Sequence, residues 1–356
     1  RRQRQMCIRD RCVNIMTNNQ VDYFSYVNCF SKTEKIHSIL IKQDDIKISN
    51  ITIAIPTYKR NGNLKEAVES SLNQMGFDET YQVLVVDNNP ERNDETEKLI
   101  LTYNDCRLSY YKNSENLGMF GNWNRLFTLA HSNYIVILHD DDILSPFFLR
   151  DISRVLNMYP NASVIQAEKV KWNEKERCRP ILFNDVKQYG VQRISLESQF
   201  YKFYFQAPTG TLFRRQDVIE LGGFNSDFYP SSDYIFMCNM IQKKEVYFYK
   251  KPLLIYRVGV NTTSKIETQI KWLDIEWCFK QFLCKFVSLP EWFKQYVKYS
   301  NMIIRFKSIK ERDSNFIYSI NDEDLKYPSY TYRIFYKIFD KFLEWYWVNN
   351  GIINKL

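Results

Sequence analysis

The fold is decided at residues 134–142, which have the sequence Tyr-Ile-Val-Ile-Leu-His-Asp-Asp-Asp. The apolar run is short and β-branched, so it predicts a buried strand. Asp140, Asp141 and Asp142 follow it directly, and carboxylates this close repel one another unless a cation lies among them. Ligands bind at this edge of an open α/β sheet, and oxygen ligands suit Mg²⁺ or Mn²⁺. The alternative is an acidic turn before a helix that begins at Ser145-Pro146.

Strands and helices alternate on both sides of this stretch. Buried strands are predicted at 51–56, 81–87 and 107–112. Between them helices are predicted from a capping box at Asn63 and Glu66, at 91–103 and at 121–131. Repeated units of this length indicate a parallel sheet with helices on both faces. In the second half the predicted strands are 207–213, 245–249 and 253–257, and the predicted helices are 217–221 and 231–243.

Polar clusters follow four of these strands, at 56–60, 87–89, 116–118 with Asn124, and 140–142. Turn chemistry explains each cluster taken alone, because Asn, Asp, Pro and Gly are ordinary turn residues. The carboxyl ends of successive parallel strands, however, lie along one edge of a sheet. The four clusters together therefore indicate one binding site.

The composition excludes several classes of protein. The chain of 356 residues carries a formal charge of +8, but residues 1–11 contribute five Arg and one Asp to it. The remainder is mildly basic with its charges dispersed, which argues against nucleic-acid binding. The eight Cys are scattered without a C-x-x-C pair and there are three His, so a zinc site is not expected. Scattered thiols fit a reducing cytosol, and no apolar run approaches the ~20 residues of a membrane span.

The chain divides into four parts by pattern. Residues 1–11 have no periodicity and resemble translated adaptor sequence, so they are left out of the fold prediction. Residues 12–50 form an N-terminal extension. Residues 51–260 form the region of alternating strands and helices, which divides into the halves 51–145 and 146–260. Aromatic and basic residues interleave at helical spacing over 261–356 and predict a helical C-terminal extension.

In four stretches the chain resembles the family 2 glycosyltransferases of bacterial polysaccharide and O-antigen synthesis. The matching stretches are Ile55 to Arg60, Val85 to Asn89, Asn116 to Asn124, and Leu138 to Asp142 with Pro146. Their order along the chain is the specific signal, and the resemblance extends over about 51–257. It implies the α/β fold called GT-A, in which a mostly parallel central sheet carries helices on both faces.

The resemblance also implies roles on the nucleotide side of the site. Asp87 would contact the base, Asp140 the sugar-nucleotide, and Asp141 the metal, with Asp142 as a second metal candidate. Many members have Asp where this chain has His139, which leaves the register of the acidic motif open by one residue. The other nucleotide-sugar-binding positions implied are Pro56, Thr57, Tyr58, Arg60, Asn116, Gly118 and Asn124.

The acceptor side is implied by the segment that includes Gly222-Gly223-Phe224-Asn225 and ends in Ser231-Ser232-Asp233. The family's acidic pair keeps its second acid here, so Asp233 is the expected general base. A first-turn acid of the following helix is the alternative role for Asp233. Thr209 and Gly210 match a segment that lines the sugar pocket, and Arg257 is expected to act as a phosphate fork.

The aromatic and basic residues after 270 allow two interpretations. They form helices packed on the catalytic domain, or they attach the protein to a membrane surface with Trp, Tyr and Lys at the interface. The best candidate for membrane contact is 330–339. Family members that build surface polysaccharides use lipid-linked acceptors, which would make such a surface useful.

The sequence thus predicts an inverting glycosyltransferase that depends on Mn²⁺ or Mg²⁺. It would move a sugar from a nucleoside diphosphate donor, expected to be a UDP-sugar, to a hydroxyl of a saccharide or lipid-linked saccharide. The expected location is the cytoplasm, at the inner face of the membrane. A catalytically silent relative acting as a binding or scaffold subunit is the alternative. A sugar-nucleotide pyrophosphorylase is disfavoured because the loop after the first strand has one Gly, Gly62, where a triphosphate cradle needs more.

Overall fold

The computed structural model describes residues 21–43, 45, 49–173, 175–176, 178–182, 188–205, 207–258, 265–312, 338, 341–342 and 353–355. The stretch 1–11 lies outside these residues, as does the candidate membrane segment 330–339 apart from Ile338. Of the predicted C-terminal extension, 261–356, the described part is therefore mainly 265–312.

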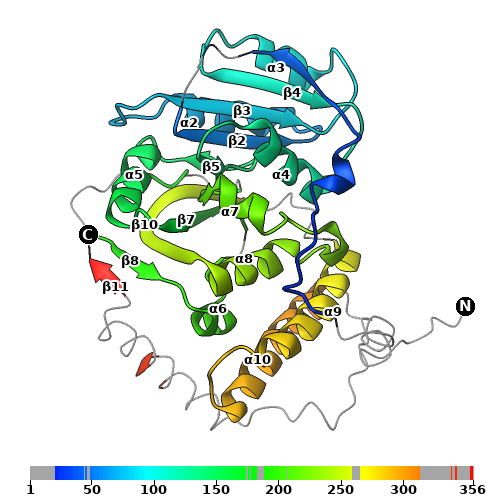
Figure 1. The fold of residues 1–356 in the computed structure, drawn as a ribbon, viewed down its shortest axis with the longest axis vertical. Coiled ribbons are helices and arrows are strands. Elements are labelled where there is room, and N and C mark those ends of the chain that lie inside the picture. The colour runs from blue at the N-terminus through cyan, green and yellow to red at the C-terminus, as the bar shows by residue number, and fades with distance from the viewer. Residues whose placement is uncertain are drawn as a thin grey trace, which may run out of the picture.

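The described strands form one mixed sheet, with β1 at one edge and β11 at the other (Figure 1). Its order is β1-β4-β3-β2-β5-β9-β7-β10-β8-β11, with β6 paired to β10. The block β4-β3-β2-β5 is parallel, as predicted, and so is the pair β7 and β10. The strands are β1 Ser38–Lys42, β2 Ile51–Thr57, β3 Tyr81–Asp87, β4 Leu108–Asn113, β5 Tyr134–Ile137, β6 Ile143–Leu144, β7 Ala162–Asn173, β8 Gly190–Arg193, β9 Thr211–Arg214, β10 Glu245–Val258 and β11 Ile353–Lys355.

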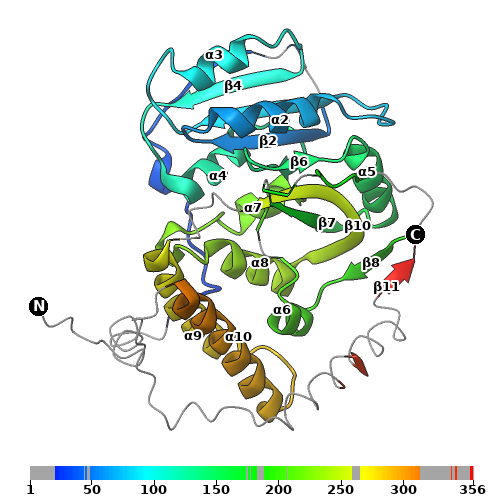
Figure 2. The same ribbon diagram turned by 180° about the vertical axis from the view of Figure 1, so that it is seen from behind.

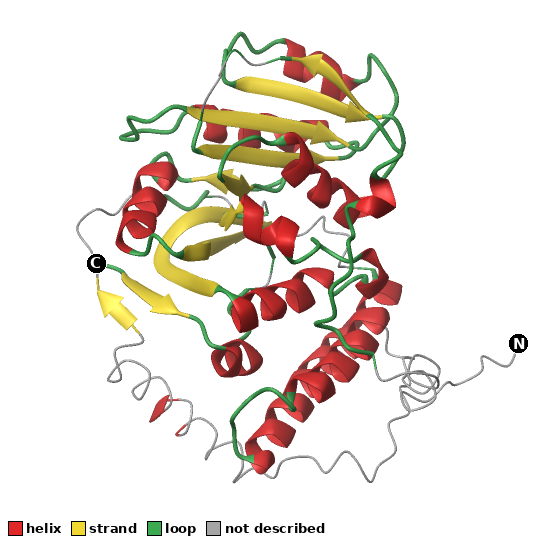
Figure 3. Ribbon diagram, in the orientation of Figure 1, coloured by secondary structure: helices red, strands yellow, loops and turns green. Residues whose placement is uncertain are grey.

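Helices cover both faces of the sheet, as Figures 1 and 2 show from opposite sides. Side chains alternate along β2, so Ile53 and Ile55 enter one core with α2 and α5 while Ala54 enters the other with α4, α8 and α9. Figure 3 separates the helical layers from the strands between them. The α-helices are α2 Asn61–Leu72, α3 Glu95–Leu101, α4 Gly118–Leu129, α5 Phe148–Met158, α6 Leu196–Lys202, α7 Arg215–Glu220, α8 Ser232–Lys243, α9 Ile266–Leu283 and α10 Glu291–Arg312.

The region predicted as two strands around Pro252 is a single long strand, β10. Its register against β7 shifts between Tyr249 and Pro252 and again between Pro252 and Leu254. Such bulges tolerate a proline, which has no N–H to donate to the ladder. The strand therefore continues past Pro252, and its ribbon is curved (Figure 1). This bend lets β10 pair with β7, β8 and β6.

The predicted capping box of the first helix is wrong. Helix α2 begins at Asn61 with no side-chain cap at Arg60. Asn63 instead accepts a hydrogen bond from Arg257 Nη1 at 3.3 Å, and Glu66 lies 2.9 Å from Arg257 Nη2. The two residues therefore face β10 across the sheet edge. Similarly, α5 begins at Phe148 rather than at Ser145-Pro146.

The N-terminal extension is tied to the rest of the molecule at two places. Strand β1 pairs antiparallel with β4 at the edge of the sheet. Tyr23 and Phe24 are buried, and their rings lie 5.1 and 6.0 Å from that of Phe279 on α9. The sequence patterns did not indicate either contact.

Helices α9 and α10 lie side by side below α8 (Figure 1). Phe279 and Leu283 of α9 and Phe293 and Val297 of α10 are buried in the core shared with α8, which supports the packing interpretation for this part of the extension. Among the described helices, none combines the length and the hydropathy that crossing a membrane requires. Cys278 on α9 is disulfide-bonded, so the expectation of free thiols fails at this position.

Candidate active site

The polar clusters predicted from the sequence meet at one edge of the sheet. Thr57 at the end of β2 is in register with Asp87 at the end of β3, and Asp87 is in register with Lys112 on β4. The loop after β5 reaches the same edge, because Thr57 Oγ1 donates to Asp140 Oδ2 at 2.7 Å. The parallel pairing of these strands thus brings together residues that are more than 80 positions apart.

Each acid of the triplet is buried and has its own partners. Asp140 accepts the Thr57 hydroxyl, and Asp141 Oδ2 accepts a hydrogen bond from Arg60 Nη1. Asp142 accepts the hydroxyl of Thr209 at 2.8 Å through Oδ2 and the backbone N–H of Arg257 at 3.0 Å through Oδ1. The three carboxylates therefore have separate hydrogen-bond partners, and Arg60 supplies positive charge.

Crowding of these acids has an electrostatic cost. Burial raises the pKa of Asp140 to about 6 and that of Asp142 to about 8, and the charge of Asp141 adds to both increases. Hydrogen bonds from Thr57 and Thr209 act in the opposite direction. A divalent cation at this point would favour the ionised carboxylates and relieve the repulsion.

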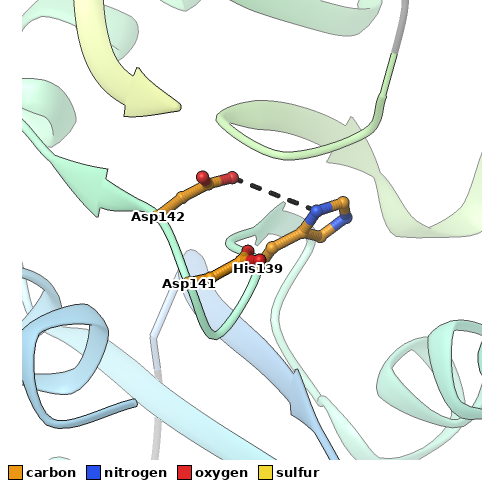
Figure 4. A group of neighbouring side chains, drawn as sticks. All are labelled: His139, Asp141 and Asp142. Atoms are coloured by element: carbon orange, nitrogen blue, oxygen red, sulfur yellow. Dashed lines mark ion pairs between the residues drawn. The ribbon is translucent and has the colours of Figure 1, made fainter. Parts of the chain in front are cut away.

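His139 joins Asp141 and Asp142 in a group that has the donors of a metal site (Figure 4). One ligand atom from each of the three residues lies within 4.8 Å of the others, and His139 Nδ1 is 4.0 Å from Asp142 Oδ2. The imidazole stacks on Trp123 of α4 with ring centroids 5.3 Å apart. Burial lowers the pKa of His139 to about 4. Two carboxylates and an imidazole fit a divalent cation.

Asp87 lies inside a buried network at the end of β3. Its Oδ2 accepts hydrogen bonds from Lys112 Nζ and Tyr110 OH, each at 2.8 Å, and its Oδ1 accepts the N–H of Asn89 at 2.9 Å. Lys112 Nζ also lies 3.0 Å from Asp94 Oδ2. The Asp87 side chain has no exposed surface, so the contact with a base that the resemblance implies stays a prediction.

Asn88 holds the loop that carries Asn116 and Gly118. Its Nδ2 donates to Asn116 Oδ1 at 2.6 Å and to Gly118 O at 3.2 Å, and its Oδ1 accepts the N–H of Leu117 at 2.8 Å. Gly118 begins α4 at a φ of +70°, which favours glycine. The side-chain amide of Asn116, which was predicted to contact the nucleotide-sugar, is therefore bonded to that of Asn88.

Asn124 connects the two halves of the domain. Its side chain donates to Phe224 O at 2.9 Å and accepts the Phe224 N–H at 2.8 Å, across 100 sequence positions. Because Asn124 is buried and both hydrogen bonds go to one residue, its amide fixes the Gly-Gly-Phe segment that precedes α8. Nucleotide-sugar contact by Asn124 remains a prediction.

Asp233, the predicted base, lies in the first turn of α8 with Oδ1 accepting the N–H of Tyr234 at 2.9 Å. Burial raises its pKa to about 7, the charge of Glu276 adds to the increase, and the charge of Lys169 opposes it. A carboxylate with a pKa near neutrality is suited to take a proton at physiological pH.

Thr209 and Gly210 lie at the start of β9, behind the acidic loop. Thr209 accepts the N–H of His139 at 3.2 Å, so its hydroxyl fixes the loop at two points. Gly210 has a φ of +66°, and a Cβ there would come within 2.9 Å of Leu254 Cδ2. These contacts hold the loop against β10, and a sugar contact for the pair stays a prediction.

Three further residues predicted to contact the nucleotide-sugar are Arg257, Pro56 and Tyr58. Arg257 is buried on β10, where its guanidinium faces Glu66 and lies 5.2 Å from the Trp172 ring. Pro56 is buried within β2, and Tyr58 is exposed beyond it. Phosphate contact by Arg257 and nucleotide contact by Tyr58 remain predictions.

Sequence reasoning missed Lys169 on β7. Its ammonium is close enough to lower the pKa of Asp142 and of Asp233, and it lies 4.8 Å from the Tyr256 ring centroid. Burial in turn lowers the pKa of Lys169. The available signal was a lysine within the strand pattern of β7, but lysines are mostly exposed in folded proteins. Lys169 brings positive charge between the acidic loop and Asp233.

The sheet, its two helical layers and the acidic loop at the carboxyl edge define the GT-A fold of glycosyltransferases. Residues 52–222 match the family model described as glycosyl transferase family 2, and this part of the chain belongs to that family. A sequence relative is an uncharacterized protein, MT1568, of Mycobacterium tuberculosis. It is 24% identical over 239 residues, which are 63% of this chain and 72% of the relative.

Solved structures show the same fold at low sequence identity. TarS of S. aureus, residues 1–349, matches with a TM-score of 0.54 and 14% identity over 77% of each chain. The same protein in complex with UDP-GlcNAc has a TM-score of 0.54, 15% identity and 75% coverage of each chain. A mannosyltransferase of Pyrobaculum calidifontis in complex with GDP-Man and Mn²⁺ has a TM-score of 0.51, with 15% identity over 81% of each chain.

Proposed function

We propose that the protein is an inverting glycosyltransferase that depends on a divalent metal ion and uses a UDP-sugar as donor. One observation carries this proposal: Lys169 is close enough to lower the pKa both of Asp142, in the acidic loop, and of Asp233 on α8. A donor bound at the acidic loop would therefore have a base near neutral pKa beside it. Family membership of 52–222 and the complexes of the fold relatives with UDP-GlcNAc and GDP-Man support a nucleotide-sugar.

The residues have distinct proposed tasks in the reaction. Arg60, Thr57 and Asp140 orient the nucleotide, because they are already bonded into one cluster at the end of β2. Asp141 and Asp142 would hold the metal, Mn²⁺ or Mg²⁺, which when bound supplies charge compensation for the diphosphate. Asp233 accepts the proton of the acceptor hydroxyl while the hydroxyl oxygen bonds to C1 of the sugar and the C1–O bond to the diphosphate breaks.

The acceptor and the location are also proposed. A saccharide or lipid-linked saccharide of a cell-surface polysaccharide fits an inverting transfer to a hydroxyl. The C-terminal extension supports contact with the inner face of the membrane, because Phe286, in the turn between α9 and α10, and Trp292, on α10, are exposed beside a packed core. Five described cysteines are free thiols, which supports a cytoplasmic location despite the disulfide at Cys278. Residues 51–260 are taken as the catalytic domain.

A donor screen tests this proposal. Purified full-length protein is incubated with single nucleotide-sugars and a saccharide acceptor, and release of nucleoside diphosphate is measured with and without Mn²⁺. We expect release from a UDP-sugar, dependence on Mn²⁺, and loss of release in Asp141→Asn and in Asp233→Asn. Asp227→Asn is the matched control, because Asp227 is an exposed acid a few residues before α8.

The screen also decides between an enzyme and a silent relative. A catalytically silent binding subunit would bind the nucleotide-sugar, as measured by calorimetry, without releasing nucleoside diphosphate under any condition. Full activity in both aspartate variants would contradict the proposed roles of Asp141 and Asp233, whichever donor is used.

A further inference from the structure

The imidazole of His139 is the feature of the site that the family pattern does not explain. Family members commonly carry a carboxylate at this position, whereas here Nδ1 faces Asp142 Oδ2 at 4.0 Å, as the dashed line in Figure 4 shows. His139 Nε2 is buried and has no hydrogen-bond partner among the described residues. Of the two ring nitrogens, Nδ1 is the one that faces the carboxylate, so Nδ1 is the atom that the ring offers to a cation.

The geometry points to His139 as a metal ligand that acts together with Asp141 and Asp142, giving the site one nitrogen and two carboxylate donors. We thereby infer that the site prefers a cation that accepts imidazole, such as Co²⁺ or Mn²⁺, to Mg²⁺. This inference rests on the proposed function, since it concerns the cation of the same site. It goes beyond that function because it assigns a ligand and a cation preference.

The distances suit this assignment. Metal–ligand bonds of about 2.1 Å separate two ligand atoms by about 3.0 Å when adjacent and about 4.2 Å when opposite in an octahedron. The three ligand atoms here lie within 4.8 Å of one another, so closure around an ion needs shifts of a fraction of an ångström to about 1 Å. Hydrogen bonds to Asp141 and Asp142 do not prevent binding, because each carboxylate offers about four lone-pair sites.

The surroundings fix the ring in place for this role. Trp123 stacks on the imidazole with an interplanar angle of 23°, and the backbone N–H of His139 donates to Thr209, whose hydroxyl also bonds Asp142. The hydroxyl of Thr209 therefore holds both His139 and the carboxylate of Asp142. Imidazole favours later first-row ions, whereas carboxylates, carbonyls and water suit Mg²⁺. A neutral nitrogen in place of a carboxylate thus shifts the cation preference away from Mg²⁺.

Spectroscopy tests the assignment without an activity assay. The protein is loaded with Mn²⁺ in the presence of UDP at pH 7.5, and electron spin-echo envelope modulation reports ¹⁴N bonded to Mn²⁺. The chain has three His, so the source of a nitrogen signal can be identified by substitution. We expect ¹⁴N modulation in the wild type and its loss in His139→Phe, which keeps a ring on Trp123 but has no nitrogen. His131→Phe, at an exposed position, is the matched control and should keep the signal.

Cation affinities provide the second measurement. Calorimetric titrations with Co²⁺ and with Mg²⁺, each with UDP present, should show that His139→Phe weakens Co²⁺ binding at least about tenfold while Mg²⁺ changes less. His139→Asp should move the preference toward Mg²⁺. Mn²⁺ binding without ¹⁴N modulation, or an unchanged Co²⁺ to Mg²⁺ ratio in His139→Phe, would overturn the inference and leave the proposed transferase intact. Failure of the wild type to bind either cation would contradict both.

Discussion

Asp233 gives the most detailed prediction, which concerns the pH dependence of transfer. Its pKa rises from an ordinary 3.8 to about 7, mainly because removal from water in the folded chain disfavours the charged carboxylate. A base must be deprotonated, so kcat/KM should rise with pH and level off, with a midpoint near pH 7. About one tenth of the molecules would carry the active carboxylate at pH 6 and about nine tenths at pH 8. The assay is nucleoside diphosphate release at saturating metal across pH 5.5 to 9.

Neighbouring charges determine the direction in which this midpoint moves. The Lys169 ammonium lowers the pKa of Asp233, so Lys169→Met should move the midpoint to higher pH, whereas Lys169→Arg should leave it nearly unchanged. Glu276 raises the same pKa, so Glu276→Gln should move it to lower pH. Each shift should be on the order of 1 unit or less. A midpoint that does not move in either Lys169→Met or Glu276→Gln would refute the assignment of Asp233 as the titrating base.

The same pKa shift predicts a stability difference of definite sign. The folded protein binds the Asp233 proton more tightly than the unfolded chain, so the free energy of unfolding falls as pH rises from about 4 to about 7. A shift of about 3 units corresponds to an upper limit of about 4 kcal/mol. Asp233→Asn imitates the protonated acid, so it should be more stable than the wild type at pH 8 and about equal at pH 4. Urea unfolding at both pH values measures this, and a variant less stable at pH 8 would contradict the cause assigned to the shift.

Three further substitutions test other parts of the site. Asp141→Asn should lower kcat/KM at least about 100-fold and remove the response to Mn²⁺, measured by nucleoside diphosphate release; a retained response would refute its role as metal ligand. Lys112→Met leaves the Asp87 carboxylate buried without its cation. This should lower the free energy of unfolding, measured with urea, by about 3–5 kcal/mol, and adding Asp87→Asn should restore part of it. Gly210→Ala should lower the free energy of unfolding by about 1–3 kcal/mol, because the φ of Gly210 is +66° and a Cβ there would lie 2.9 Å from a leucine methyl on β10. Gly62→Ala, where a Cβ meets nothing within 4 Å, is its control, and equal melting temperatures for the two would contradict the strain argument.

Much of the fold could be predicted because local patterns determined it. Strands β2, β3 and β5 are short apolar runs that end in turn residues, and both signals lie within a few positions of each other. Parallel pairing then follows from the helices between them. The hydrogen bond between Thr57 and Asp140, in the acidic loop, follows from the same topology.

The features that escaped prediction depend on partners distant in sequence. Edge strand β1 is a short segment that pairs with β4 some 70 positions later, and nothing local distinguishes it from a loop. Asn63 and Glu66 match a capping box by type, but Arg257 is their partner in the folded chain. Lys169 is recognisable only once β7 lies between the acidic loop and α8. Burial and charge from non-local neighbours cannot be inferred from spacing along the chain.

The most direct test of the central claim is a single comparison of product formation. Wild-type protein, Asp141→Asn and Asp233→Asn are incubated with a UDP-sugar, a saccharide acceptor and Mn²⁺, and UDP release is measured together with the anomeric configuration of the glycoside formed. The account predicts UDP release with inversion at C1 in the wild type and loss of both products in the two variants. Retention of configuration, or full release by either variant, would contradict it.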